Sequence, residues 1–274
     1  MRKRKRILIS VGLLALVFLT GCSDTTIPTQ EESRNSSTQE SESGAQEGDG
    51  DMAENISAEL PETEEISSEP GPATLLYQGQ ASIRVVTDEG KVIYIDPYAG
   101  DSYELPADLI LVTHAHFDHS QTDKVENRNE GCRIITYAEA LQDGAHRTFD
   151  LGYVTVEAVE AGYNPLHDAG NCVGYVLTFS NGKSVYVTGD TSKTEQMAYM
   201  DEMEIDYAFF CCDGVYNMGL EEAAECACLV GAKHNIPYHM TTTTTGRQFD
   251  REIAEQFDVE NRLIVEDGEE ILIE

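Results

Sequence analysis

Basic residues are scarce in this sequence. Its 274 residues include 18 Lys and Arg against 50 Asp and Glu, which gives a formal net charge of −32 at pH 7. Such a chain repels phosphate backbones and anionic membrane surfaces, so we expect no binding to nucleic acid. The acidic balance does not specify a substrate, because a metal site can create a local positive field inside an acidic protein.

A hydrophobic run long enough to cross a membrane is missing from the N-terminus. The basic residues 2–6 are followed by an apolar run of about a dozen residues, 7–19, which is too short to span a bilayer comfortably and is typical of a processing signal. The run ends in Leu19-Thr20-Gly21-Cys22, which resembles the bacterial lipobox. We predict a signal peptide over residues 1–21 and a lipid on Cys22 that anchors the protein outside the cytoplasm. An uncleaved anchor or an ordinary secretory signal is the alternative, and either would also export the chain.

Regularly spaced cysteines are absent as well. The six cysteines other than Cys22 are an even number in an exported chain, where disulfides are permitted. Their spacing shows no disulfide framework, and Cys211 and Cys212 are neighbours that would face opposite sides of a strand. We therefore predict no particular bridge and a buried, inert thiol at Cys212. The six are Cys132, Cys172, Cys211, Cys212, Cys226 and Cys228.

Apolar residues are sparse between residues 22 and 72. This segment consists mainly of Ser, Glu, Gln, Gly, Thr and Asn and cannot bury enough apolar surface to offset the entropy of ordering. We predict a disordered acidic linker with a reach of about 40 Å. The rest of the chain, residues 73–274, is long enough for one sizeable core, and we expect a single domain there.

From residue 73 onward, short β-branched runs alternate with turn residues, and Asn181-Gly182 is a strong hairpin signal. Helical patterns are expected at 194–200, 220–231 and 247–257. Strands and helices mixed over about two hundred residues favour an α+β domain in which sheets pack against helices. The strands are expected at 74–77, 82–86, 92–95, 108–112, 133–136, 154–159, 173–180, 184–188, 205–212 and 262–265.

Three histidines and a carboxylate follow the apolar strand expected at 108–112. His114 and His116 lie two residues apart, so in extended backbone they face the same side and could share one ion. Asp118 and His119 follow as the chain turns, and could serve a second ion. A solvated polar loop is the alternative, but histidines clustered behind an apolar strand are typical of metal sites.

The His-x-His-x-Asp-His pattern of residues 114–119 resembles the signature of the metallo-β-lactamase superfamily. That resemblance implies a four-layer αββα sandwich, and the downstream segments are similar too. Ala161 to Tyr175, with His167, looks like the segment of the third histidine. Thr188-Gly189-Asp190 resembles the end of the strand with the bridging carboxylate, and His239 looks like the last ligand. The resemblance covers about residues 79 to 239.

Within the superfamily the chain is most similar to the L-ascorbate-6-phosphate lactonase-like branch. The marks are Gly79-Gln80-Ala81-Ser82, Tyr94-Ile95-Asp96-Pro97, Tyr163-Asn164 and the segment 215–224. The chain departs from that pattern at Gln80, where relatives often have histidine, and at 211–214, where they have glycine-rich sequence. We expect Asp96 to be a hydrogen-bond acceptor at a strand end rather than a catalyst.

The resemblance implies hydrolysis by a hydroxide held between two divalent metal ions, zinc or else manganese. It places the first ion on His114, His116 and His167 and the second on Asp118, His119 and His239, with Asp190 bridging them. Asp118 is expected to orient the hydroxide or relay its proton, and Asn164 to contact the transition-state oxygen. The expected substrate is a lactone, an ester or a phosphorylated small molecule, because the fold itself does not choose among them.

Two other functions compete with hydrolysis. The first is a surface lipoprotein that captures a metal ion or a ligand without turnover, which would suit the tether and the acidic surface. The second is an exported domain whose metal is purely structural. The full set of seven ligands, including a bridging carboxylate, is more than the capture of one ion needs, and hydrolysis is therefore the preferred hypothesis.

Overall fold

A computed structural model of the chain describes residues 71–241 and 249–274. The predicted signal peptide, Cys22 and all but the last two residues of the predicted linker lie outside these ranges. Within them, no helix is long and apolar enough to cross a membrane.

Two six-stranded sheets form the centre of the fold. The first has the strand order β14-β1-β2-β3-β4-β5 and the second the order β13-β12-β11-β10-β9-β8. The first sheet consists of β1 (Ala73–Gly79), β2 (Ser82–Val86), β3 (Val92–Ile95), β4 (Ala107–Val112), β5 (Arg128–Thr136) and β14 (Glu270–Ile273). The second consists of β8 (Thr148–Asp150), β9 (Val154–Glu160), β10 (Val173–Phe179), β11 (Ser184–Val187), β12 (Tyr207–Cys211) and β13 (His234–Tyr238).

Strand direction decides which ends of the sheets meet. In the first sheet β1, β2 and β3 are successively antiparallel, and β4 is parallel to β3, so β1, β3 and β4 all run the same way. In the second sheet β9, β10 and β11 are successively antiparallel, and β12 and β13 continue parallel to β11. The carboxyl ends of β9, β11, β12 and β13 therefore share one edge, as do those of β1, β3 and β4 in the other sheet.

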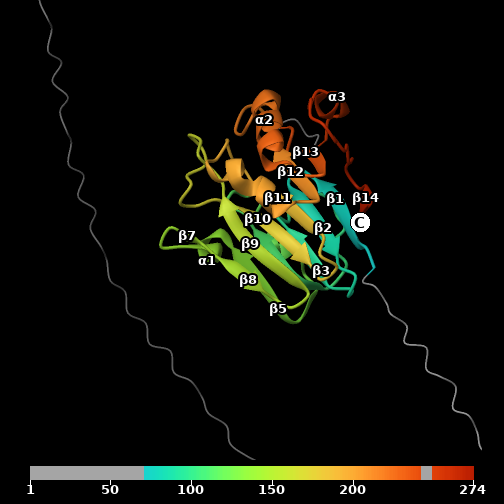
Figure 1. Cartoon of the computed structure of the whole chain (residues 1–274). Coiled ribbons are helices and arrows are strands. Elements are labelled where there is room, and N and C mark those ends of the chain that lie inside the picture. The colour runs from blue at the N-terminus through green and yellow to red at the C-terminus, as the bar shows by residue number, and fades with distance from the viewer. Residues whose placement is uncertain (1–70, 242–248) are drawn as a thin grey trace, which may run out of the picture. The chain divides into compact units, whose positions relative to one another are not determined.

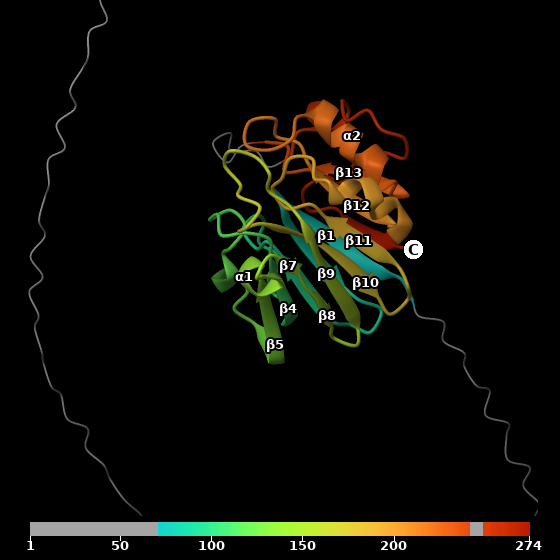
Figure 2. The ribbon, with the colours of Figure 1, turned by 60° about the vertical axis from the view of Figure 1, so that its left-hand side comes forward.

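The sheets pack face to face, and Figures 1 and 2 show the cyan and green strands of the first sheet against the yellow and orange strands of the second. Inward-facing residues of both sheets form one core cluster. The rings of Tyr77 on β1 and Phe209 on β12 lie 6.4 Å apart, and the Tyr175 hydroxyl on β10 donates to the carbonyl of Val112, 3.1 Å away. Burial of the alternate apolar residues is what drives this packing.

Helices cover the outer face of the second sheet. On α2 (Leu220–Val230), the buried residues Ala223, Cys226, Ala227 and Val230 recur at helical spacing, so one stripe of the helix faces the sheet. The 3-10 helix η2 (Gln196–Met203) packs beside α2. Figure 1 shows α2 over the β12 and β13 side of the sandwich. With both faces covered, β12 is buried along its whole length.

The outer face of the first sheet is covered differently. Val92, Tyr94 and Ile110 form a small cluster there with Tyr103 and Val125, which lie in the loop after β3 and directly after the 3-10 turn η1 (Thr122–Lys124). This loop and the 3-10 turn η1 pack on that face as part of the fourth layer. The expected αββα sandwich is confirmed, with this layer much reduced.

Most of the predicted strands are confirmed, and the Asn181-Gly182 hairpin joins the antiparallel pair β10 and β11. The helix predicted at 194–200 is the 3-10 helix η2. A helix was also predicted at 247–257, and the described part of that range is helical only over α3 (Arg251–Ala254). The Asp250 carboxylate caps the start of α3 by accepting hydrogen bonds from the amides of Glu252 and Ile253. The remaining short elements are α1 (Tyr137–Ala140), β6 (Leu141–Gln142) and β7 (Ala145–His146).

The strand predicted at 262–265 is wrong, since Arg262 makes only an isolated bridge to Asn235. The C-terminal strand is instead β14, which pairs antiparallel with β1. Only Ile273 of the four residues Glu270–Ile273 is buried, as is typical of a strand at the edge of a sheet. The segment has no alternation of polar and apolar residues that would mark it as a strand in the sequence.

Candidate metal centre

All seven predicted metal ligands lie at the edge where the carboxyl ends of these strands meet. His114 follows β4, Asp190 follows β11 and His239 follows β13 directly. The loop after β9 carries His167. Because the backbone amide of His239 donates to the carbonyl of Gln80 at 3.0 Å, the edge of the first sheet is also tied to that of the second. The seven residues are His114, His116, Asp118, His119, His167, Asp190 and His239.

The ligands form two clusters. His114, His116, His167 and Asp190 present nitrogen or carboxylate oxygen atoms within 4.8 Å of one another. Asp118, His119 and His239 form a second group at the same spacing. Apart from Asp190, which was expected to bridge the two ions, these are the two groups that the family resemblance assigned to the first and the second ion. That they bind metal remains a prediction.

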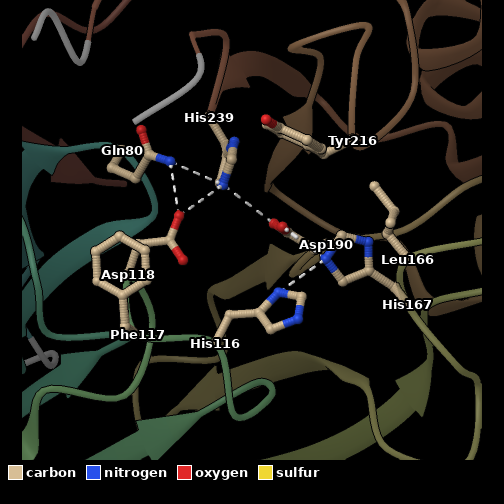
Figure 3. Close-up of a pocket in the computed structure, with 9 residues that line it drawn as sticks. All are labelled: Gln80, His116, Phe117, Asp118, Leu166, His167, Asp190, Tyr216 and His239. Carbon is tan, nitrogen blue, oxygen red and sulfur yellow. Dashed lines mark hydrogen bonds and ion pairs between the residues drawn. The ribbon is translucent and has the colours of Figure 1, made fainter. Parts of the chain in front are cut away.

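Asp190 connects the clusters through its two oxygens. Its Oδ2 lies 3.2 Å from His167 Nε2 and 3.9 Å from His114 Nε2. Its Oδ1 lies 3.3 Å from the Nε2 atoms of both His119 and His239. A carboxylate whose oxygens face different histidine pairs has the geometry of a bridging ligand. Figure 3 shows Asp190 between His239 and His167.

Backbone conformation holds the ligands in place. Gly189 has φ +61, and a Cβ there would lie 2.9 Å from the carbonyl oxygen of Val173, so the residue before Asp190 must be glycine. Gln80, Asp96 and His239 have φ between 43 and 52 although none is glycine. Left-handed backbone in such residues is unfavourable and is concentrated at functional sites.

Buried polar atoms without partners support a fit to metal ions. In the described part of the chain, His114 Nε2, His119 Nε2 and Asp190 Oδ1 are buried and make no hydrogen bond. Unsatisfied buried groups cost free energy, and here they face one another. Imidazole nitrogens and carboxylate oxygens are the ligands that zinc and manganese accept, so this donor set fits the two ions.

Two carboxylates orient the histidines of the second cluster. Asp96 Oδ2 lies 2.7 Å from His119 Nδ1, and Asp213 Oδ2 lies 3.4 Å from His239 Nδ1. Such partners set the tautomer of a ligand and increase its basicity. Asp96 is thus the hydrogen-bond acceptor expected from its position. The role of Asp213 was missed, although an aspartate two residues after the end of the buried strand β12, which is parallel to β11, was a usable signal.

Electrostatics differ between the two clusters. Burial lowers the pKa of His114 to about 2, assisted by the nearby His119. Burial alone would also lower the pKa of His119, but the Asp190 and Asp96 carboxylates raise it well above the ordinary value. The pKa of His239 is raised in the same way by Asp190 and Asp213. His239 and His119 in turn overcome the effect of burial on Asp190 and hold its pKa well below the usual value.

Neutral groups orient the first cluster. Thr113 Oγ1 lies 3.1 Å from His114 Nδ1, and Asn164 Oδ1 lies 3.1 Å from His167 Nδ1. Asn164 Oδ1 also accepts from the amides of Leu166 and His167, both at 3.0 Å. Asn164 therefore positions His167 and does not line the pocket described below. Its predicted contact with a transition-state oxygen remains a prediction.

The clusters open into a cavity of about 340 Å³. Asp118 and Asp190 contribute to its wall, together with three of the histidines, and apolar side chains lie at its mouth (Figure 3). Gln80 was noted in the sequence only as a departure from the family pattern, and neither Gln80 nor these apolar residues were predicted to line the site. The lining residues are Gln80, His116, Phe117, Asp118, Leu166, His167, Asp190, Tyr216 and His239.

A sandwich of two mixed sheets with a histidine and carboxylate cluster at one edge defines the metallo-β-lactamase fold. Residues 74–239 match the sequence model of the family described as Beta-lactamase superfamily domain. Because this match covers more than half of the sequence, the chain belongs to that family.

Relatives in sequence and structure agree with this assignment. The chain is 30% identical over 195 residues to a UPF0173 metal-dependent hydrolase from Geobacillus thermodenitrificans, covering 61% of this chain and 84% of that protein. It is 29% identical over 249 residues to another from Thermodesulfovibrio yellowstonii, covering 74% and 93%. The solved structure of Igni18, a metallo hydrolase from Ignicoccus hospitalis, has a TM-score of 0.58 at 21% identity, covering 74% of this chain and 99% of that one, which shows the same fold. The protein is a metal-dependent hydrolase.

Proposed function

We propose that the protein holds two divalent ions, zinc or else manganese, and hydrolyses a lactone, an ester or a phosphorylated small molecule. The observation that carries this proposal is Asp190, whose two oxygens face different histidine pairs. Two ions at such a site acidify a water molecule and polarise a carbonyl or phosphoryl oxygen. The resemblance to the ascorbate-6-phosphate lactonase branch supports a lactone or a phosphorylated compound among these substrates.

Each side chain then has a defined task. The first ion would be held by His114, His116 and His167, and the second by Asp118, His119 and His239, with Asp190 shared. Asp118 also lines the cavity, which supports the proposal that its carboxylate would orient the attacking water and accept its proton. Asn164 orients the His167 side chain through the hydrogen bonds described above.

The test is metal content and turnover of the purified full chain. We expect two ions per chain in the wild type and hydrolysis of at least one compound in a panel of lactones, esters and phosphate esters. Asp190→Ala should lose both metal and turnover. Asp206→Ala is a matched control, because Asp206 is an equally buried carboxylate at the other end of β12 that accepts from the amide of Ser184.

Full metal content and turnover in Asp190→Ala would refute the assignment. One ion or none in the wild type, with no turnover on the panel, would instead favour a lipoprotein that captures metal or ligand.

We also propose that the domain, residues 73–274, is tethered outside the cytoplasm by a lipid on Cys22 through the acidic linker. The support is the order of basic residues, apolar run and Leu19-Thr20-Gly21-Cys22. The wild-type protein should be extracted from membranes with an acylated N-terminal peptide. Cys22→Ser should lack the acyl mass, and acylation elsewhere or none in the wild type would reject the lipobox.

A further inference from the structure

The mouth of the cavity is unusually apolar for an exposed surface. Phe117, Leu166 and Tyr216 line it, and their side chains are 60%, 54% and 41% exposed. They come from three separate loops, those of His116, His167 and Asp213. Val215, beside Tyr216, is 65% exposed. Single exposed apolar residues need no explanation, but several around one cavity mark a binding surface.

The rest of the described surface offers a contrast. Large exposed hydrophobic side chains number seven in the described ranges, and five of them lie on the loops that carry candidate ligands or their partners. These five are Phe117, Tyr163, Leu166, Val215 and Tyr216. The other two, Tyr199 on η2 and Leu272 on β14, stand alone. The concentration at one edge therefore reflects the site and not a generally apolar surface.

Positive side chains are absent from the described lining of the cavity. None of the nine lining residues is lysine or arginine, and two, Asp118 and Asp190, are carboxylates. Proteins that recognise phosphate groups usually supply arginine, lysine or a helix N-terminus. Within the described lining, a phosphate held away from the metal centre would meet Phe117, Leu166 or Tyr216, none of which carries a positive charge to offset the lost hydration.

We propose that the substrate is an uncharged ester or lactone whose alkyl or aryl group packs on Phe117, Leu166 and Tyr216, and not a phosphorylated compound. This proposal rests on the proposed hydrolytic function and selects among its substrates. Hydrolysis adds one water across the acyl carbon–oxygen bond. The products are a carboxylate and an alcohol, with release of one proton. The apolar group does not react, so its burial contributes to specificity.

The experiment compares acyl chain length at a constant leaving group. The metal-loaded full chain is assayed on 4-nitrophenyl esters from acetate to octanoate, and on a matched aliphatic ester with and without a terminal phosphate. Each methylene buried should increase kcat/KM about fourfold, until the cavity mouth is filled. The phosphorylated ester should be the poorer substrate of its pair.

Variants separate the mouth from the chemistry. Leu166→Ser and Tyr216→Ser should flatten the dependence on chain length while metal content stays at two ions. Tyr199→Ser is the matched control, because it removes an exposed tyrosine outside the cavity, 71% exposed against 41% for Tyr216, and it should keep the wild-type dependence. A flat dependence in the wild type, or faster turnover of the phosphorylated ester, would overturn the substrate proposal alone. Absence of both metal and turnover on all substrates would overturn the proposed function as well.

A second, independent observation concerns Gln80. Its side chain is buried, and its Nε2 lies 3.1 Å from Asp118 Oδ2 and 3.0 Å from His239 Nε2. These are ligand atoms of the second cluster, as Figure 3 shows. The other amide atom, Oε1, is buried without a hydrogen-bond partner in the described part of the chain. The backbone is fixed, since the Gln80 carbonyl accepts from the Tyr77 hydroxyl at 2.9 Å.

An amide nitrogen is the wrong atom to face a cation. When His239 Nε2 and Asp118 bind an ion, the Gln80 NH₂ group loses its acceptors and is repelled by the positive charge. A half-turn of the terminal amide exchanges Nε2 and Oε1, and the two orientations differ only in hydrogen bonding. We infer that Gln80 presents Oε1 to the second ion as an additional ligand.

Metal affinity tests this role without relying on activity. Competition with a chromophoric chelator should show that Gln80→Ala weakens one of the two binding steps by about tenfold or more, whereas Gln80→Glu restores it with a carboxylate oxygen. Gln78→Ala is the control, because Gln78 is a buried glutamine two residues before Gln80, on β1, that lines a different pocket. Wild-type affinity in Gln80→Ala, or equal weakening in Gln80→Glu, would overturn the inference.

Discussion

Replacing Asp96 by asparagine should weaken metal binding although Asp96 is not a ligand. Its buried carboxylate accepts from the Thr113 amide at 2.8 Å and the Thr113 hydroxyl at 2.6 Å, and lies 2.7 Å from His119 Nδ1. Asparagine retains one acceptor oxygen and puts an NH₂ group in place of the other. Loss of a carboxylate that orients a ligand typically costs 10–100-fold in metal affinity, which is about 1.4–2.7 kcal/mol.

The assay is chelator competition on metal-free protein, combined with urea unfolding. We expect Asp96→Asn to lower the affinity of one ion within this range and to lower the free energy of unfolding by about 1.5–3 kcal/mol, because a buried hydrogen bond to a charged group is lost. Asp206→Asn should cost stability while the metal affinity stays unchanged. Wild-type metal affinity in Asp96→Asn, or an equal loss in Asp206→Asn, would refute the role of Asp96.

Two further predictions follow from the site. In chelator-treated protein, Asp190 raises the folded-state pKa of His119 and His239 above about 6.5. Protonation of these two histidines therefore stabilises the folded state fully below that pH, and this stabilisation is lost as the pH rises through their folded-state pKa values. The urea concentration at the midpoint of unfolding should decrease between pH 6 and pH 9. Metal-loaded protein should show no such fall, because ions require deprotonated imidazoles, and the same fall in both forms would contradict this. Gly189→Ala should destabilise the protein by about 1–3 kcal/mol and lower its metal content, since the added Cβ meets the Val173 carbonyl oxygen at 2.9 Å; wild-type values of both would contradict the need for glycine there.

The local parts of the fold and site could be predicted from sequence. Alternating apolar residues and the Asn181-Gly182 turn identified β10 and β11 because strand periodicity and turn geometry depend on neighbouring residues. In the same way, the 114–119 segment placed three histidines and a carboxylate behind a strand. The weak edge strand β14 escaped prediction, because its formation depends on pairing with β1 and not on its own pattern.

The sequence by itself determined the set of candidate ligands and the strands that precede them, because both depend on patterns within short segments. The tertiary structure alone decided that Asp190 faces two histidine pairs, that Asp213 orients His239 and that Gln80 lies beside Asp118. Only packing of the two sheets brings these residues together from β1, β4, β11, β12 and β13. Contacts between residues so distant along the chain depend on strand order and direction, which no local pattern encodes.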